Sequence, residues 1–240
     1  MPRDWNASAY HRLSDAQLAM GLDVLERLEL RGDERVLDAG CGTGRVTAVL
    51  LERLPAGEVV AVDGSPSMVE QARARLGERA DVRVADLLEL ELERPVDAIL
   101  STATLHWIAD HDRLFARLLS VLRPGGRLVA QCGGAGNAAE IEAAIVRVHD
   151  FGGWSPWNFV SPAETEARLV GLGWTDVWTW SNIVDVRPEE PRDYLATVVL
   201  GAHLDRLPEA EHDAFVDAVL AELADPVVRY VRLNILARRP

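Results

Sequence analysis

Lysine is absent from this sequence of 240 residues, in which all 25 basic residues are arginine. Its absence excludes a Walker A phosphate-binding loop, a pyridoxal-phosphate Schiff base and a lysine general base. Acidic residues outnumber basic ones by 38 to 25, which gives a formal net charge of −13. We therefore expect no nucleic-acid partner, because non-specific affinity for nucleic acid requires clustered positive charge.

Cysteine and long apolar runs are also scarce. The two cysteines, Cys41 and Cys132, are too few for a disulfide framework or a zinc site. No apolar run approaches the roughly 20 residues that span a bilayer, and no apolar signal segment follows Met1 to Tyr10. These features predict a cytoplasmic, metal-free protein that has no membrane partner.

Short β-branched runs alternate with amphipathic segments along the first 150 residues. The predicted strands are Arg35–Ala39, Glu58–Asp63, Val82–Ala85, Val96–Ser101 and Arg127–Cys132. The predicted helices are Asp15–Leu30, Val46–Leu54, Pro66–Leu76, His111–Leu122 and Ala138–His149. Ser14 and Gln17 form a capping-box pattern at the first helix, and Pro124-Gly125-Gly126 ends the fourth. This alternation indicates βαβ units, and hence an α/β fold with a parallel sheet.

The pattern changes after His149, where five of the seven tryptophans occur within 30 residues. Glycines and prolines surround Trp154 and Trp157, so we expect these two in a lid over the substrate. We expect Trp174, Trp178 and Trp180 in the core beneath a sixth strand. Two further helices, near Pro191–Leu200 and Pro208–Leu223, precede a closing strand at Val227–Ala237.

A single domain, 1–240, is predicted from this organisation. It comprises an N-terminal cap (1–34), a cofactor-binding core (35–150), a Trp-rich lid with the sixth strand and a helical insertion (151–225), and the closing strand (226–237).

The strongest local signal is the glycine-rich turn after the first predicted strand. Glycines at 40, 42 and 44 allow backbone to approach a polar ligand at a helix N-terminus. The dinucleotide fingerprint would need a further glycine where Arg45 stands. Asp38 would oppose a pyrophosphate, whereas it suits a ligand that carries an amino group and a sulfonium.

Two further acids end successive predicted strands. Asp63 lies 19 residues past Gly44, where doubly wound folds present a carboxylate to ribose hydroxyls. Asp86 follows the next strand and suits an exocyclic amine such as that of adenine. Three acids at the carboxyl ends of three strands predict a nucleoside-containing ligand, because ligands of such sheets bind there.

Residues 35–132 resemble the class I S-adenosylmethionine-dependent methyltransferases. The matching motifs are VLDAGCGTG, VVAVDGSPSM, VRVADLLEL, DAILSTATLHW and LRPGGRLVAQ. Outside this core, Trp5–Tyr10, Leu105–Trp107 with Asp110-His111, and Tyr230–Leu233 resemble the trans-aconitate 2-methyltransferase-like branch. The resemblance implies a Rossmann-like, doubly wound sheet of seven strands, mostly parallel with an antiparallel C-terminal strand. It also implies an N-terminal helix, a helical lid insertion, S-adenosylmethionine as cofactor and S-adenosylhomocysteine as product.

The same resemblance implies roles for individual residues. The methionine end of the cofactor would face Asp38, Gly40 and Gly42, with Ser101 and Thr102 near the sulfonium. The ribose would bind Asp63. The adenine would lie between Gly64 and Met68, with its edge read by Asp86 and the Leu87 amide.

The acceptor side is predicted from residues beyond these motifs. Tyr10 and His11 belong to a segment that would fold over the cofactor, and Trp107 would form a pocket wall. Asn137 follows the fifth strand and would reach the substrate. Arg229 and Arg232 are candidates to hold an anion, with surface ion pairing as the alternative. The candidate substrate contacts are therefore Tyr10, His11, His106, Trp107, Asn137, Trp154, Trp157 and Arg229.

His106 stands where the branch often has a glutamine, which leaves its role open between a base, a substrate-positioning group and a structural group. The expected activity is methyl transfer to a small-molecule acceptor by a monomer or homodimer. The resemblance favours O-methylation of a carboxylate, with a hydroxyl or carbon acceptor as the alternative. A nicotinamide-dependent oxidoreductase and a non-catalytic cofactor-binding regulator are the rival classes.

Overall fold

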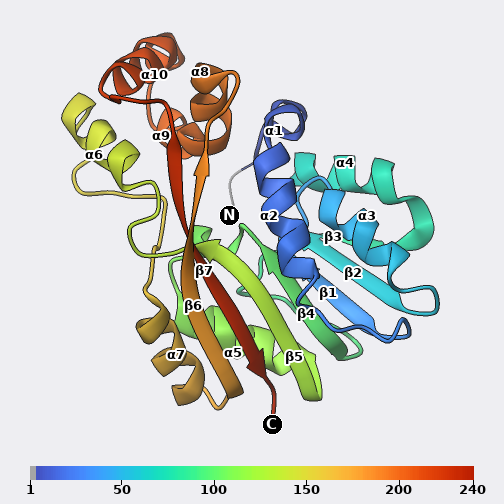
Figure 1. The fold of residues 1–240 in the computed structure, drawn as a ribbon. Helices are drawn as coiled ribbons and strands as arrows, with labels where there is room; N and C mark the ends of the chain where they lie inside the picture. Colours follow the sequence, from blue (N-terminus) through green and yellow to red (C-terminus); the bar gives the residue numbers. More distant parts are fainter. Residues whose placement is uncertain (1–3) are drawn as a thin grey trace.

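A seven-stranded sheet forms the centre of the computed structural model, which describes residues 4–240. The strand order is β3-β2-β1-β4-β5-β7-β6. All pairings from β3 to β5 are parallel, and β7 is antiparallel to both β5 and β6 (Figure 1). The strands are β1 (Arg35–Ala39), β2 (Glu58–Asp63), β3 (Asp81–Val84), β4 (Val96–Thr102), β5 (Leu122–Gly133), β6 (Thr175–Val186) and β7 (Val228–Arg238). The predicted fold class is confirmed.

Helices cover both faces of the sheet and its carboxyl edge (Figure 1). The helices are α1 (Ala7–Leu13), α2 (Asp15–Leu25), α3 (Arg45–Glu52), α4 (Pro66–Leu76), α5 (His111–Val121), α6 (Ala139–Val148), α7 (Pro162–Gly171), α8 (Pro191–Tyr194), α9 (Gly201–Leu204) and α10 (His212–Ala221). Shorter turns are η1 (Gly77–Arg79), η2 (Leu105–Trp107), η3 (Leu195–Val199) and η4 (Glu209–Glu211). α6, α8, α9 and α10 form a helical cap beyond the ends of β6 and β7 (Figure 1).

Alternation along the strands divides the core into two layers, because successive side chains of a strand point to opposite faces. In β1, Val36 packs with α2, α3 and α4, whereas Leu37 packs with α5 and α7. A third apolar cluster joins α2, α6, α8, η3 and α10 to the start of β7. The helical cap is therefore packed on the same sheet that carries the glycine-rich turn.

The largest boundary differences within the first 150 residues concern α2 and β5. α2 ends at Leu25 rather than Leu30, and the expected capping box is not formed, because Ser14 makes no side-chain cap hydrogen bond. β5 begins at Leu122, ahead of the predicted turn, since Leu122 already pairs with Val96 before a shift in register. The Gly125 amide donates to the carbonyl of Arg239. This hydrogen bond holds the predicted turn residues within the irregular first part of β5.

The sixth strand corrects one expectation about the tryptophans. Trp174 is buried, but Trp178 is 62% exposed and lies against the ring of Trp180 at 4.7 Å. The reason is topological, because β6 is an edge strand that pairs with β7 alone. Alternation therefore does not by itself place a tryptophan of β6 in the core.

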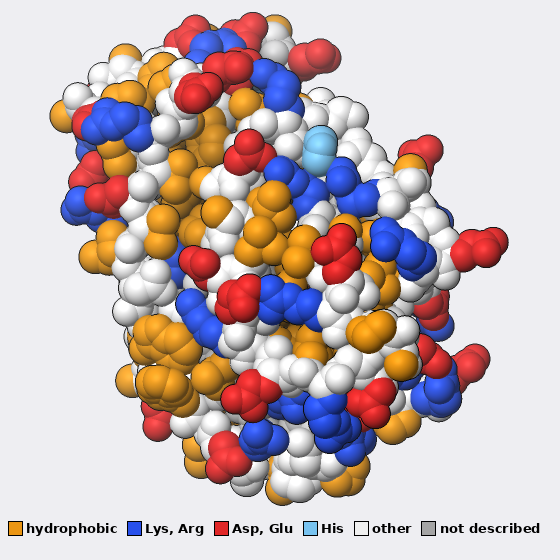
Figure 2. All heavy atoms as spheres, turned by 45° about the vertical axis from the view of Figure 1, so that its right-hand side comes forward, with side chains coloured by type: hydrophobic (Ala, Val, Ile, Leu, Met, Phe, Trp, Pro, Cys, Tyr) orange, Lys and Arg blue, Asp and Glu red, His pale blue; other side chains and the backbone are white. Residues whose placement is uncertain are grey.

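Charged side chains of both signs are interspersed over the face shown in Figure 2. Several arginines are bound by acids, such as Arg192 by Asp213 and Asp217 and Arg187 by Asp225. Among residues 4–240, no helix combines the length and apolar character needed to cross a membrane.

Candidate functional site

The glycine-rich turn joins β1 to α3 at the carboxyl edge of the sheet. The Gly40 and Cys41 amides both donate to the carbonyl of Val62, at 2.8 and 2.9 Å. Gly40 has a φ of +88°, and a Cβ on it would lie 2.0 Å from the Thr104 hydroxyl oxygen. A side chain cannot fit here, so glycine is required for the turn to pack against the end of β4.

Asp63, at the end of β2, holds the turn from the other side. Its Oδ2 accepts from the Gly42 amide at 2.9 Å and its Oδ1 accepts from the Ser65 amide at 2.9 Å. Burial raises the pKa of Asp63, against the opposing effect of these amides. Because a carboxylate oxygen can accept more than one hydrogen bond, both oxygens retain capacity for hydroxyl donors.

Asp38 lies beneath the turn with only 1% of its surface exposed. Its Oδ2 accepts from the Thr47 hydroxyl at 2.7 Å, but its Oδ1 has no hydrogen-bond partner. Burial raises the pKa of this carboxyl to about 6. An unsatisfied buried carboxylate oxygen is costly, so this position fits a cationic donor.

Gln17 supplies a second unpartnered acceptor, at a cavity lined by the glycine-rich turn. Its buried Oε1 makes no hydrogen bond, while its Nε2 donates to the hydroxyls of Tyr194 and Tyr230 at 2.6 and 3.3 Å. Gln17 lines a small cavity of about 70 Å³ together with Tyr10, Ser14, Leu18, Gly40, Cys41, Gly42, Thr43, Arg45, Val46, Thr102 and Ala103. Two unsatisfied acceptors suit the ammonium group of S-adenosylmethionine, so the residues present fit the expected cofactor.

The predicted adenine side lies at the ends of β2 and β3. Met68 and Leu87 are buried, and Gly64 follows Asp63 directly. The Oδ1 of Asp86 accepts from the Leu88 amide at 2.9 Å, which orients its carboxylate at the strand end. The structure thus brings the predicted cofactor residues to one edge. Ser101 lies there too, at the end of β4, but its hydroxyl donates to the carbonyl of Ala39 at 2.7 Å.

Asp4 and Trp5, the first described residues, close this side of the cleft. The sequence did not predict their individual contacts. The Trp5 amide donates to the Ser65 hydroxyl at 3.1 Å, and the Ser67 amide donates to Asp4 Oδ1 at 3.0 Å. The Trp5 ring packs edge-on against Tyr10 at 5.6 Å and against Trp107 at 5.1 Å. The N-terminal segment therefore bridges the turn after β2 and the loop after β4.

His106 lies in η2, immediately after β4, and is 6% exposed. Its Nδ1 accepts a hydrogen bond from the Gly133 amide at 3.2 Å. Burial, and secondarily the charge of Arg232, holds its pKa well below 6.5. The ring is therefore neutral at pH 7, with its proton on Nε2 because Nδ1 acts as an acceptor.

Aromatic rings line the acceptor side. Trp157 stacks on Phe159 at 5.4 Å and lies 6.2 Å from Trp107. His203 of α9 contacts Trp157 at 5.0 Å and Trp154 at 5.5 Å. These contacts join the Trp-rich segment to the helical cap on one side and to η2 on the other.

The other predicted acceptor residues fall in different surroundings. Asn137 is buried beside Gly133, and its Oδ1 has no partner. His11 lies near the Arg75 guanidinium, at 3.3 Å. Arg229 is exposed and makes two hydrogen bonds to Asp185, at 2.9 and 3.1 Å. The structure does not bring Arg229 together with His106.

Tyr194 and Ala103, which the sequence did not single out, lie beside the site, as does Arg232, one of the two predicted anion candidates. Ala103 has a φ of +55°, an uncommon backbone conformation for alanine, directly after β4. The Arg232 side chain is 3% exposed, in β7 next to Gly133 of β5. Alternation separates Arg229 from Arg232, but the sequence alone does not show which of them points inward.

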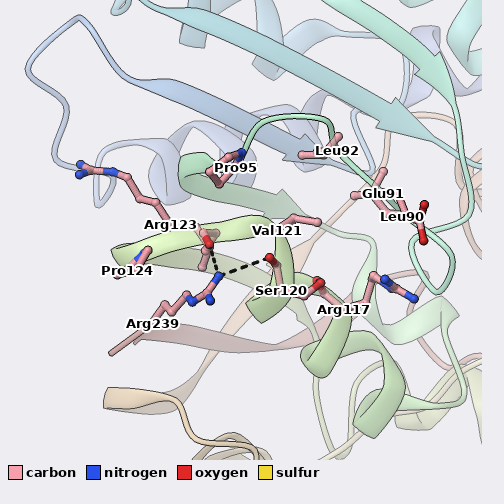
Figure 3. A pocket seen from close by; sticks show the side chains of 11 residues that line it. Leu90, Glu91, Leu92, Pro95, Arg117, Ser120, Val121, Arg123, Pro124 and Arg239 are labelled. Atoms are coloured by element: carbon pink, nitrogen blue, oxygen red, sulfur yellow. Dashed lines mark hydrogen bonds between the residues drawn. The ribbon is translucent and has the colours of Figure 1, made fainter.

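A larger hollow, of about 570 Å³, lies at the opposite edge of the sheet (Figure 3). Its Arg239 donates to the carbonyls of Leu119 and Ser120, both at 3.3 Å, and so satisfies the end of α5. Its Arg123 is paired with Asp97. These side chains have structural partners, and we therefore place the functional site at the carboxyl edge.

Comparison with known proteins identifies the family of the chain. Residues 36–126 match a family model described as a methyltransferase domain. A trans-aconitate 2-methyltransferase from Deinococcus radiodurans is 32% identical over 233 residues, which cover 91% of this chain and 90% of the relative. A protein of the same name from Methylobacterium radiotolerans is 38% identical over 154 residues, or 64% of this chain. That match covers 57% of the relative, so the aligned part spans just over half of its length.

Two solved structures share the fold. Phosphoethanolamine N-methyltransferase 2 from Haemonchus contortus, in complex with S-adenosylmethionine, aligns with a TM-score of 0.68 at 21% identity, covering 98% of this chain and 56% of that chain. Geranyl diphosphate C-methyltransferase from Streptomyces coelicolor aligns with a TM-score of 0.57 at 22% identity, covering 96% and 80%. The chain belongs to the class I S-adenosylmethionine-dependent methyltransferases, within the trans-aconitate 2-methyltransferase branch.

Proposed function

We propose that the protein transfers the methyl group of S-adenosylmethionine to a carboxylate oxygen of a small organic acid. A lone pair of that oxygen bonds to the methyl carbon as the carbon–sulfur bond breaks, and the electron pair remains on sulfur in S-adenosylhomocysteine. No proton is transferred, and the product is a methyl ester. The relatives named trans-aconitate 2-methyltransferase support a carboxylate as the acceptor.

The protonation state of His106 carries this proposal. Its Nδ1 is occupied by the Gly133 amide, and its Nε2 bears the remaining ring proton. His106 therefore donates a hydrogen bond to an acceptor oxygen and does not remove a proton from it. A hydroxyl acceptor needs a base, whereas a carboxylate is already ionised near neutral pH.

The chain's own residues bind and orient the two reactants. Asp38 and Gln17 would hold the ammonium group of the cofactor, and Asp63 would bind the ribose hydroxyls. Asp86 and the Leu87 amide would read the adenine edge, with Gly64 and Met68 beside the ring. Trp5, Trp107 and Trp157 exclude water from the acceptor side, so that catalysis depends mainly on positioning and desolvation.

Incubation of the purified protein with S-adenosylmethionine and trans-aconitate tests the proposal. We expect release of S-adenosylhomocysteine and a product whose new methyl group is removed by mild base, as esters are. A base-stable methyl group would instead identify a hydroxyl or carbon acceptor and would contradict the proposal. Thermal stabilisation by NAD but not by S-adenosylhomocysteine would contradict the cofactor.

A further inference from the structure

All three tyrosines of the chain gather beside one arginine above the carboxyl edge. Tyr10 comes from α1, Tyr194 from α8, and Tyr230 from β7. The hydroxyls of Tyr194 and Tyr230 lie 2.7 Å apart, and both accept from Gln17 Nε2. The Arg232 guanidinium lies 5.6 Å from the ring centre of Tyr230.

Arg232 carries a buried charge that has no counterion in this structure. Its Nε donates to Gln131 Oε1 at 3.3 Å, and its terminal nitrogens have no hydrogen-bond partner among residues 4–240. No carboxylate of that part of the chain lies within ion-pair distance of it. A buried cation without a paired anion is strongly unfavourable, which indicates that an anion completes the site.

The titratable groups around Arg232 are neutral and present donors. They are the Cys132 thiol, the His106 ring and the three phenols. Burial raises the pKa of the thiol and of each phenol and lowers the pKa of His106. One of the two hydroxyls, Tyr194 or Tyr230, donates its proton to the other. The proton of the accepting hydroxyl has no acceptor among the described residues. Two guanidinium nitrogens and a phenol proton therefore remain for a ligand that has several acceptor oxygens.

This cluster adjoins the acceptor side of the cleft. Arg232 pairs in register with Gly133, the residue whose amide holds His106. The charge of Arg232 also contributes to the low pKa of His106. An anion at Arg232 therefore lies beside His106, on the far side of β4 from the carboxylate of Asp63.

We propose that Arg232, with the phenols of Tyr194 and Tyr230, binds a carboxylate of the acceptor other than the one that is methylated. This inference rests on the proposed function. A carboxylate held by a guanidinium fork has both oxygens in charge-assisted hydrogen bonds, which makes it a poor nucleophile. The oxygen that attacks belongs to a second carboxylate of the same acid, as the trans-aconitate in the relatives' names provides. The inference is that Arg232 and the two phenols are the residues that select an acid with this additional carboxylate.

Fumarate and crotonate form a matched pair of probes, because crotonate has a methyl group where fumarate has its second carboxylate. Binding of each acid to the S-adenosylhomocysteine complex is measured by calorimetry, and kcat/KM for each is measured with S-adenosylmethionine. We expect the wild-type protein to prefer fumarate by at least about tenfold in both measurements, the scale of one charge-assisted hydrogen-bonded pair.

Arg232→Gln should abolish this preference, with a kcat/KM for fumarate that falls at least about tenfold and a smaller fall for crotonate. Arg229→Gln is the matched control, because Arg229 lies three residues away on β7 and is paired with Asp185 at the surface. If Arg232→Gln does not fold, Arg232→Lys and Tyr194→Phe each remove part of the donor set. Each should reduce the preference for fumarate several-fold.

Equal binding of fumarate and crotonate to the wild-type complex would overturn the inference, as would an equal loss for both acids in the Arg232 and Tyr194 variants. A different outcome would contradict the proposed function alone: fumarate binding would depend on Arg232, but no base-labile methyl group would form on any acid.

Discussion

The Gly133 amide donates its hydrogen bond to Nδ1 of His106, across 3.2 Å, and so links the end of β5 to the loop after β4. This contact determines which ring nitrogen of His106 faces the acceptor with a proton. Under the proposed function, this tautomer lets His106 orient an oxygen of the acceptor rather than deprotonate it.

His106→Ala should lower kcat/KM by about tenfold to a hundredfold, which is the scale for loss of one buried hydrogen bond and of its packing. Because the pKa of His106 lies well below 6.5, the activity of the wild-type protein should not change between pH 6.5 and 8 through this group. The variant should give the same flat profile at a lower level. A wild-type rate that rises with pH near 6.5, with the rise absent in the variant, would show that His106 acts as a base.

Asp38→Asn should stabilise the cofactor-free protein while it weakens cofactor binding. The folded-state pKa of about 6 lies above the unfolded value of 3.8, so this group removes stability as pH rises from 3.8 through 6. At pH 7 the neutral asparagine avoids that penalty, which is about 2 to 3 kcal/mol, and can still accept from Thr47. Thermal unfolding without ligand should therefore occur several degrees higher in the variant.

The same substitution should weaken cofactor binding, in contrast to its stabilising effect on the cofactor-free protein. Wild-type affinity for S-adenosylmethionine should fall as pH drops below about 6, because protonation of Asp38 removes the negative charge that faces the cationic ligand. Calorimetry between pH 5 and 8 should show weaker and nearly pH-independent binding for Asp38→Asn. An unchanged affinity would exclude Asp38 from the cofactor site.

His203→Phe should make the folded protein less sensitive to acid. Burial lowers the pKa of His203 from 6.5 to about 4, so the unfolded chain takes up a proton first and stability falls as pH drops from 6.5 to 4. The penalty is about 2 to 3 kcal/mol at pH 4 and absent above pH 6.5. Phenylalanine retains the ring among Phe151, Trp154 and Trp157 and carries no proton.

Denaturant unfolding at pH 4.5 and 7.5 measures this effect. The wild-type protein should lose more stability than His203→Phe between the two values. His149→Gln is the control, since the His149 side chain is exposed, and it should behave like the wild-type protein. Equal acid sensitivity in His203→Phe and the wild-type protein would show that another group destabilises the fold.

The location of the candidate cofactor residues at one edge of the sheet was predictable from the sequence, because each part of the pattern is local. A buried strand that ends in glycine or aspartate is visible in a few consecutive residues, and parallel strands bring such ends to one edge. Asp38, Asp63 and Asp86 follow this rule, and the structure places them at the ends of β1, β2 and β3.

The acceptor half depends on contacts between segments far apart in the chain. Gln17 resembles a capping residue in sequence, yet it binds two tyrosines that lie 177 and 213 residues away. The inward direction of Arg232 and the exposure of Trp178 depend on which strand lies beside β7 and on which strand forms the edge. A pattern of alternating residues carries no information about either neighbour.

The position of β7 in the chain determines when, during synthesis, the site can form. It is the last of the seven strands in chain order, yet it lies between β5 and β6, and within residues 4–240 it is the only partner of β6 in the sheet. During synthesis on the ribosome, β6 therefore emerges before the strand that it must pair with. Because β7 also carries Tyr230 and Arg232, the glycine-rich turn emerges from the ribosome before the strand on which the proposed acceptor site depends.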